Sequence, residues 1–242
     1  MKGLSGPTFI TSFNPFAESA VQEHALGQKA EAADGRIFRY GKVGATAITL
    51  GYLAVMPDQD TAELNMTVTA AAAIGATEVS FTNAATTAIA NEYAEGYLSV
   101  DYGTGIGQTL KIKSHAALTS GGASTVYLED PLVVALDTTS RVGLTPNVYN
   151  GVISCTTDAA ISVPCGVPLN TITALYYGWF QTRGVVALAA DNTIAAGYEI
   201  QADVNDAGKI DVTGTDAQVW KIGHALQGTA DTYSKPVFLT ID

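Results

Sequence analysis

Basic residues are scarce in this sequence, and their scarcity excludes several classes of function. The 242 residues include 12 Lys and Arg against 23 Asp and Glu, a net charge of −11 at neutral pH. An acidic chain repels a phosphate backbone, so no nucleic-acid partner is expected. The longest apolar stretches, such as Val185 to Ala190, are much shorter than the roughly 20 residues of a membrane-spanning helix, so no membrane partner is expected either.

Cysteine and histidine are also rare, which disfavours metal chemistry. The chain has two Cys, Cys155 and Cys165, and three scattered His, His24, His115 and His224. A zinc site needs about four ligands at suitable spacing, so we expect no metal and no cofactor. The two Cys either oxidise across a hairpin or pack separately as small apolar side chains, and the second interpretation is favoured. The N-terminal segment lacks the continuous apolar region of a signal peptide, so secretion is not expected.

Small residues replace the long side chains that build surface helices. Ala, Thr and Gly account for 37, 29 and 24 positions, and from Arg36 onward apolar and polar residues alternate in short segments bounded by Gly, Asn, Asp and Pro. This pattern predicts a mainly β fold of two β-barrel or sandwich modules with little helix. The best helix candidate is Ala84 to Glu95, and a shorter one covers Glu18 to Leu26. The predicted strands are 37–40, 47–55, 64–69, 78–82, 97–101, 109–114, 125–129, 151–154, 174–182, 185–189, 198–204, 209–213, 219–226 and 236–241.

The first 36 residues differ from the rest of the chain. They contain Phe9, Phe13 and Phe16 but show no clean period of two or of 3.6. An aromatic segment without its own pattern docks on another surface, either of its own domain or of a neighbour. We therefore predict an extended N-terminal arm over residues 1–36.

Breaks in the strand pattern near residues 62–64 and 146–151 predict the domain boundaries. The second break contains the turn-forming sequences Thr-Pro-Asn and Asn-Gly. In the preferred arrangement, residues 64–150 form a β module inserted into a second domain made of 37–62 plus 151–242. The alternative is two consecutive modules. Insertion is favoured because residues 36–55 alone are too few to bury a core.

Two motifs resemble ligand-binding loops but fit turns better. The glycine string of residues 102–107 is followed by an alternating segment instead of the helix that a nucleotide loop requires. Residues 203–211 begin like a calcium loop, but Ala207 and Gly214 occupy two ligand positions. Both segments are predicted to be hairpin turns, the second closed by Gly208.

No catalytic constellation emerges, so the sequence predicts that the protein is not an enzyme. No Ser lies in a Gly-x-Ser-x-Gly elbow, and His115 and His224 are interpreted as packed or surface strand residues. The densest aromatic segment, residues 175–183, favours core or subunit interface over sugar binding. The predicted interface residues, toward a capsid or another subunit, are Phe9, Phe13, Phe16, Tyr176, Tyr177, Trp179 and Phe180.

Several segments of the chain resemble virion proteins of tailed bacteriophages. They are residues 25–40, 44–51, 91–101, 128–132, 147–152, 177–184 and 222–227. Within that group the chain is most similar to capsid decoration proteins, also called cement proteins. The resemblance implies a structural protein made in the bacterial cytoplasm and located on the outer capsid surface of the virion.

The same resemblance implies partners and a role for each domain. The expected partners are the major capsid protein and further copies of the chain in a homotrimer, with the discontinuous domain proximal to the capsid. An alternative function is a head fibre or adhesin-type β module that binds host surface glycans. A third, a depolymerase, finds no support in the sequence.

Overall fold

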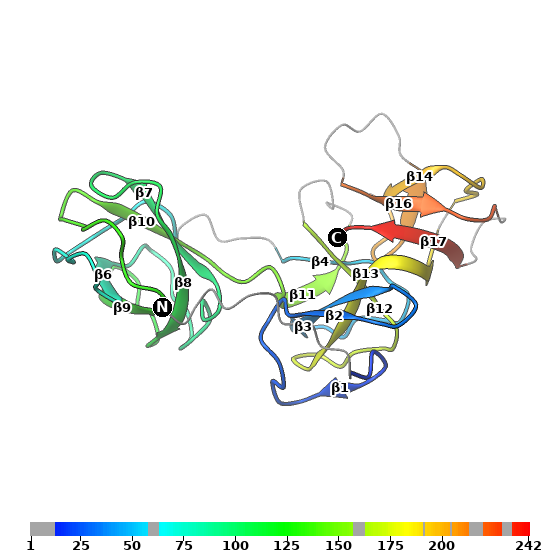
Figure 1. The fold of residues 1–242 in the computed structure, drawn as a ribbon, viewed down its shortest axis with the longest axis horizontal. Coiled ribbons are helices and arrows are strands. Elements are labelled where there is room, and N and C mark those ends of the chain that lie inside the picture. The colour runs from blue at the N-terminus through cyan, green and yellow to red at the C-terminus, as the bar shows by residue number, and fades with distance from the viewer. Residues whose placement is uncertain are drawn as a thin grey trace. The chain divides into compact units, whose positions relative to one another are not determined.

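The computed structural model describes residues 13–57, 63–156, 163–190, 192–203, 205–212, 220–228 and 234–242 (Figure 1). The regular elements in these ranges are strands, which confirms the predicted mainly β class with two barrel-like modules. The helix predicted over Ala84 to Glu95 is wrong: this segment forms turns, and Ala88 makes a β-bridge with Leu118. The helix considered over Glu18 to Leu26 is also absent. Within the same ranges no helix has the length and apolar character needed to span a membrane.

The described strands are, in chain order, β1 Glu18–Ser19, β2 Lys29–Glu31, β3 Ile37–Val43, β4 Ala54–Val55, β5 Met66–Thr67, β6 Glu78–Thr82, β7 Tyr97–Tyr102, β8 Thr109–His115, β9 Ala123–Leu128, β10 Arg141–Thr145, β11 Asn150–Ser154, β12 Pro164–Pro168, β13 Tyr177–Leu188, β14 Glu199–Ala202, β15 Ile210–Val212, β16 Lys221–Ala225 and β17 Lys235–Thr240.

The strands belong to two compact units. Strands β5 to β10 form a six-stranded unit, and all the others form an eleven-stranded unit. The chain leaves the six-stranded unit after Asn147 and re-enters the other at Val148. The six-stranded unit is thus inserted between β4 and β11, two strands that pair with each other.

A closed barrel of five strands lies at the centre of the eleven-stranded unit. Strand β13 pairs with β12, β12 with β4, β4 with β11, β11 with β3, and β3 again with β13. All pairs are antiparallel except β11 with β3. Fully buried apolar side chains pack together here: Val43, Ile48, Ala54, Val152, Cys165, Ile172 and Phe180.

Strand β13 continues past this barrel and starts a second sheet. Its residues Arg183 to Leu188 pair with β17, which is followed by β16, β14 and β15. A bridge between Ala190 and Ile210 brings β15 back beside the end of β13. The sequence predicts two strands here, 174–182 and 185–189, but the structure has one twelve-residue strand. The predicted break coincides with Gly184, which has a φ of 91°, but the strand continues through it.

The described part of the predicted arm is built into the same unit. Glu18 of β1 pairs with Gly178 of β13, and β2 pairs with β3 along its three residues. From residue 13 onward, therefore, the segment is not an extended arm. Its strands are two and three residues long, too short to produce a period in the sequence.

The six-stranded unit forms a nearly closed sheet in the order β5, β10, β7, β8, β9 and β6. A bridge between Val68 and Phe81 brings the end of β5 beside β6. The alternating inward residues of β6 to β9 fill the interior, as the period of two predicts. The largest fully buried side chains of this unit are Phe81, Leu98, Ile112, Leu132 and Leu136.

Both motifs that resemble ligand loops are turns. Residues 103–107 connect β7 to β8 as a hairpin, with Gly103, Gly105 and Gly107 at positive φ. Gly208, with φ of 76°, lies in the connection between β14 and β15. The structure confirms both turn predictions.

The two cysteines are free thiols in different apolar clusters, which confirms the prediction of separate packing. Cys155 packs with the interior of the second sheet, and Cys165 lies in the five-stranded barrel. Burial raises the pKa of Cys155 to about 12 and also raises the pKa of Cys165. Both thiols are therefore protonated near neutral pH and are shielded from reagents.

We expect neither thiol to react with Ellman's reagent in the native protein at pH 8. Roughly one Cys155 side chain in ten thousand is a thiolate at that pH. After unfolding in guanidinium, two thiols per chain should react within minutes. Rapid native reaction, or no thiol in denaturant, would contradict the buried free thiols.

Candidate interaction surface

The structure separates the predicted aromatic interface residues into buried and exposed ones. Trp179 and Phe180 are buried in the eleven-stranded unit. Phe13 packs on Phe38 and Trp179, with ring centroids 5.2 and 5.0 Å away. Phe16 is largely exposed, and Phe9 lies outside the described residues.

Tyr176 and Tyr177 are partly buried. Tyr176 packs against the barrel core, whereas Tyr177 stacks on Tyr40 with centroids 5.9 Å apart. Phe13, His24 and Trp179 complete an aromatic cluster around a hollow of about 220 Å3. Tyr40 and Trp179 are almost fully buried by their neighbours, so this hollow offers a ligand little aromatic surface.

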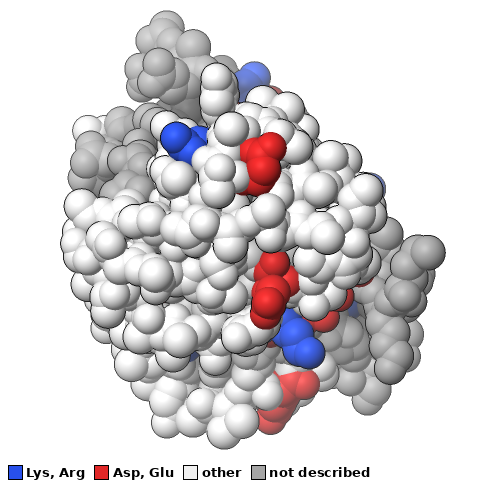
Figure 2. All heavy atoms as spheres, turned by 90° about the vertical axis from the view of Figure 1, so that its left-hand side faces the viewer, with Lys and Arg blue, Asp and Glu red and all other residues white. Residues whose placement is uncertain are grey.

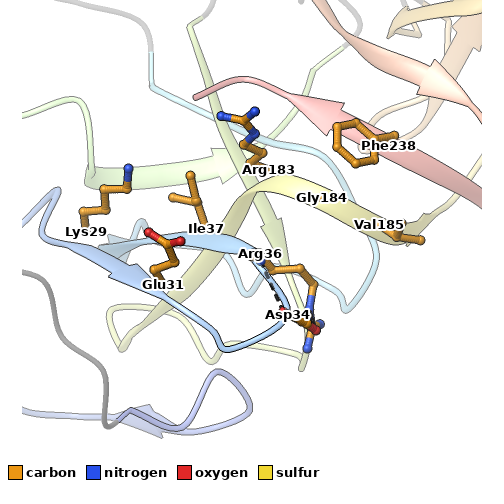
Figure 3. A pocket seen from close by; sticks show the side chains of 10 residues that line it. Lys29, Glu31, Asp34, Arg36, Ile37, Arg183, Gly184, Val185 and Phe238 are labelled. Atoms are coloured by element: carbon orange, nitrogen blue, oxygen red, sulfur yellow. Dashed lines mark hydrogen bonds and ion pairs between the residues drawn. The ribbon is translucent and has the colours of Figure 1, made fainter.

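A larger open hollow lies where β2, β3, β13 and β17 meet (Figure 3). We call it the β13 hollow, and its volume is about 860 Å3. Its lining is Lys29, Glu31, Asp34, Gly35, Arg36, Ile37, Arg183, Gly184, Val185 and Phe238. Three basic side chains thus border one hollow in a chain that has only 12.

The hairpin between β2 and β3 forms one wall. Asp34 accepts hydrogen bonds from the backbone N–H and the Nε of Arg36, the latter at 2.7 Å (Figure 3). The bond from the Arg36 backbone lowers the pKa of Asp34. Asp34 and Arg36 therefore neutralise each other, and their pairing fixes the hairpin turn.

Gly184 lines the β13 hollow at the point where β13 stops pairing with β3. Arg183 is the last residue of β13 to pair with β3, and Val185 pairs with Phe238 of β17. The φ of Gly184 is 91°, and a Cβ there would lie 2.8 Å from the Cγ of Arg36. A side chain at this position would be strained and would collide with the hairpin wall.

The other side of the β13 hollow combines a cation with exposed apolar side chains. Val185 and Phe238 are 50% and 39% exposed and lie side by side on neighbouring strands. The Arg183 side chain is exposed and forms no ion pair or hydrogen bond with the described residues. This combination suits contact with another polypeptide, in which apolar area is buried and the guanidinium binds a carboxylate in bidentate fashion.

An ion-pair network supports the strands beneath this surface. Arg39 donates from Nε and Nη2 to the two side-chain oxygens of Asp242, at 2.7 and 2.8 Å. Thr182 donates its hydroxyl to the same carboxylate at 2.9 Å. These bonds lower the pKa of Asp242, chiefly through Arg39. They tie β3 and β13 to Asp242, two residues beyond the end of β17.

The histidines and acids form no candidate metal centre in the described ranges. No group of three or more His, Cys, Asp or Glu side chains there is placed to hold a metal ion. His115 is buried, and its ring nitrogens bond the N–H of Tyr93 and the carbonyl of Ala116. His224 is exposed on β16, and His24 packs in the aromatic cluster.

No protein-family model, curated protein or solved structure matches the chain.

Sequence reasoning did not identify Arg183, Val185 and Phe238 as a surface. The pairing of β13 with β17 spans about fifty residues, and strand partners are not encoded by local alternation. One signal was present: Arg183 is the single charged residue from Asn170 to Ala190. A charge isolated in such a run marks a position that faces solvent.

We expect the network around Asp242 to stabilise the fold above about pH 4 and to lose its effect in acid. Because the folded-state pKa of Asp242 is depressed, its contribution is present at neutral pH and disappears as the pH falls through that pKa. Asp242→Asn should lower the free energy of unfolding by about 1 kcal/mol at pH 7, and by much less at pH 2. Urea denaturation at both pH values measures the difference.

Asp34→Asn is the matched control, because its ion pair with Arg36 is more exposed and local to one hairpin. It should change the stability less than Asp242→Asn does. If Asp242→Asn lowers the free energy of unfolding by the same amount at both pH values, the charged network does not stabilise the fold.

Proposed function

We propose that this protein decorates the outer surface of a bacteriophage head and stabilises the capsid lattice, with the β13 hollow contacting the major capsid protein. One observation carries the proposal: Arg183, which has no partner among the described residues, lies beside exposed Val185 and Phe238 in a chain whose net charge is −11. The resemblance to capsid decoration proteins and the composition rich in Ala, Thr and Gly also support it.

The contact area of one hollow gives modest affinity, which favours multipoint attachment. Fully burying a side chain such as Val or Phe contributes about 1.5–3 kcal/mol, and Val185 and Phe238 are already half covered. Ordering and desolvation costs reduce the net gain further. A homotrimer presents three such hollows to the lattice, and effective concentration then strengthens the combined attachment.

We expect Arg183→Glu to reduce binding to purified heads at least tenfold. The substitution reverses the unpaired charge without removing any hydrogen bond within the described residues. Co-sedimentation of heads with increasing protein measures the bound copies. Lys113→Glu is the matched control, an exposed charge reversal on β8 of the six-stranded unit. Equal binding by the two variants would exclude the hollow as the capsid contact.

Heads saturated with the protein should release their DNA at a higher temperature than heads without it. Each attachment that spans neighbouring capsid subunits adds free energy that must be lost before the lattice opens. DNA release on heating, followed by a fluorescent dye, gives the midpoint for each kind of head. Equal midpoints at full occupancy would refute the stabilising role.

A second candidate function is binding of host surface glycans, favoured by the exposed tyrosines of the six-stranded unit. Tyr97 and Tyr127 expose over 40% of their surface on β7 and β9, the two neighbours of β8. Tyrosine rings stack on sugars and donate hydrogen bonds to them.

For this second function, Tyr97→Ala together with Tyr127→Ala should abolish retention on immobilised host polysaccharide while leaving head binding unchanged. Tyr198→Ala, an exposed tyrosine of the other unit, is the control. Absence of retention by the unmodified protein would eliminate the glycan function.

A further inference from the structure

One end of the six-stranded unit is built largely from segments without charged residues. Three segments form it: residues 70–76 between β5 and β6, 103–107 between β7 and β8, and 131–136 between β9 and β10. None of them contains Asp, Glu, Lys or Arg, whereas the described part of this unit, residues 63–147, carries eight acids and three bases. We call this surface the neutral end.

Gln108 holds two of these segments together. Its side-chain oxygen accepts the backbone N–H groups of Val133 and Val134 at 3.0 and 2.9 Å. Its nitrogen donates to the carbonyls of Val134 and Gly105 at 3.0 and 3.2 Å. A buried amide that makes four such bonds fixes both loops in one conformation.

The third segment joins them through the backbone. Gly75 donates to the carbonyl of Leu132 at 2.9 Å, and Ala72 and Leu136 exchange two hydrogen bonds. All three loops thus form one preorganised surface, which loses little conformational entropy when it binds.

Apolar side chains on these fixed loops point to solvent. Ile74, Ile106, Val133 and Val134 are 70%, 64%, 69% and 46% exposed. Figure 2 shows a face with a broad uncharged area and a few charged groups. Asp130 and Asp137 flank residues 131–136 in the sequence, and Asp137 accepts a hydrogen bond from the hydroxyl of Thr104 at 2.6 Å.

We propose that the neutral end is the contact between copies of this chain in its homotrimer. Copies with net charge −11 repel each other, so their contact must use surface without acids. A basic partner would instead be attracted to the acidic parts of the unit, and the neutral end offers it no complementary charge. An exposed apolar surface whose three segments carry no charge therefore suits contact with a second copy of the chain.

This inference rests on the homotrimer of the proposed function, and sedimentation of the full chain tests it. The unmodified protein should sediment as a trimer at micromolar concentration. Val133→Asp and Ile106→Asp place a carboxylate on two different loops of the neutral end, and each should weaken association at least tenfold. Both side chains are exposed, so circular dichroism and melting temperature should stay unchanged.

Ile89→Asp is the matched control, because Ile89 is 74% exposed on the loop before β7, outside the neutral end. It should associate like the unmodified chain. Variants at Val133 and Ile106 that remain trimeric overturn the inference, as does an unmodified chain that is monomeric. Head binding is measured separately, so a trimer that does not bind heads would refute the capsid role alone.

Discussion

The twelve-residue strand β13 is the element on which the eleven-stranded unit depends. Its first half closes the five-stranded barrel through β3 and β12, and its second half starts the next sheet through β17. Two cores therefore share one backbone segment. Local damage within β13 disrupts the packing of both cores, whereas damage in β15 affects only the core that contains Ile210.

Charge is distributed so that the few basic residues serve particular contacts. Arg39 and Arg36 are engaged with Asp242 and Asp34, which fixes a strand junction and a hairpin. Arg183, which lines the β13 hollow, forms no such bond with the described residues. In an acidic chain, a guanidinium without an internal partner points to recognition more than to stability.

The alternating pattern predicted most strands because half-buried antiparallel sheets require it, as β6 to β9 illustrate. Strand β12 was not predicted. It is buried along its whole length, so its sequence shows no alternation, and Pro164 and Pro168 disfavour a strand assignment. The aromatics around Trp179 were visible, but their burial depended on Phe13 and Phe38 from distant segments. The β13 hollow depends on a long-range strand pairing, which no local pattern specifies.

The position of the insertion has a consequence for how such a protein changes over time. Strands β4 and β11 are adjacent and antiparallel, with Val55 opposite Ile153, so a short turn would join them without loss of any strand pair. The barrel is complete in its own hydrogen bonding, and the six-stranded unit has its own core. Related chains are therefore free to exchange, enlarge or discard the inserted unit and keep the same barrel, so the inserted unit evolves independently of the barrel.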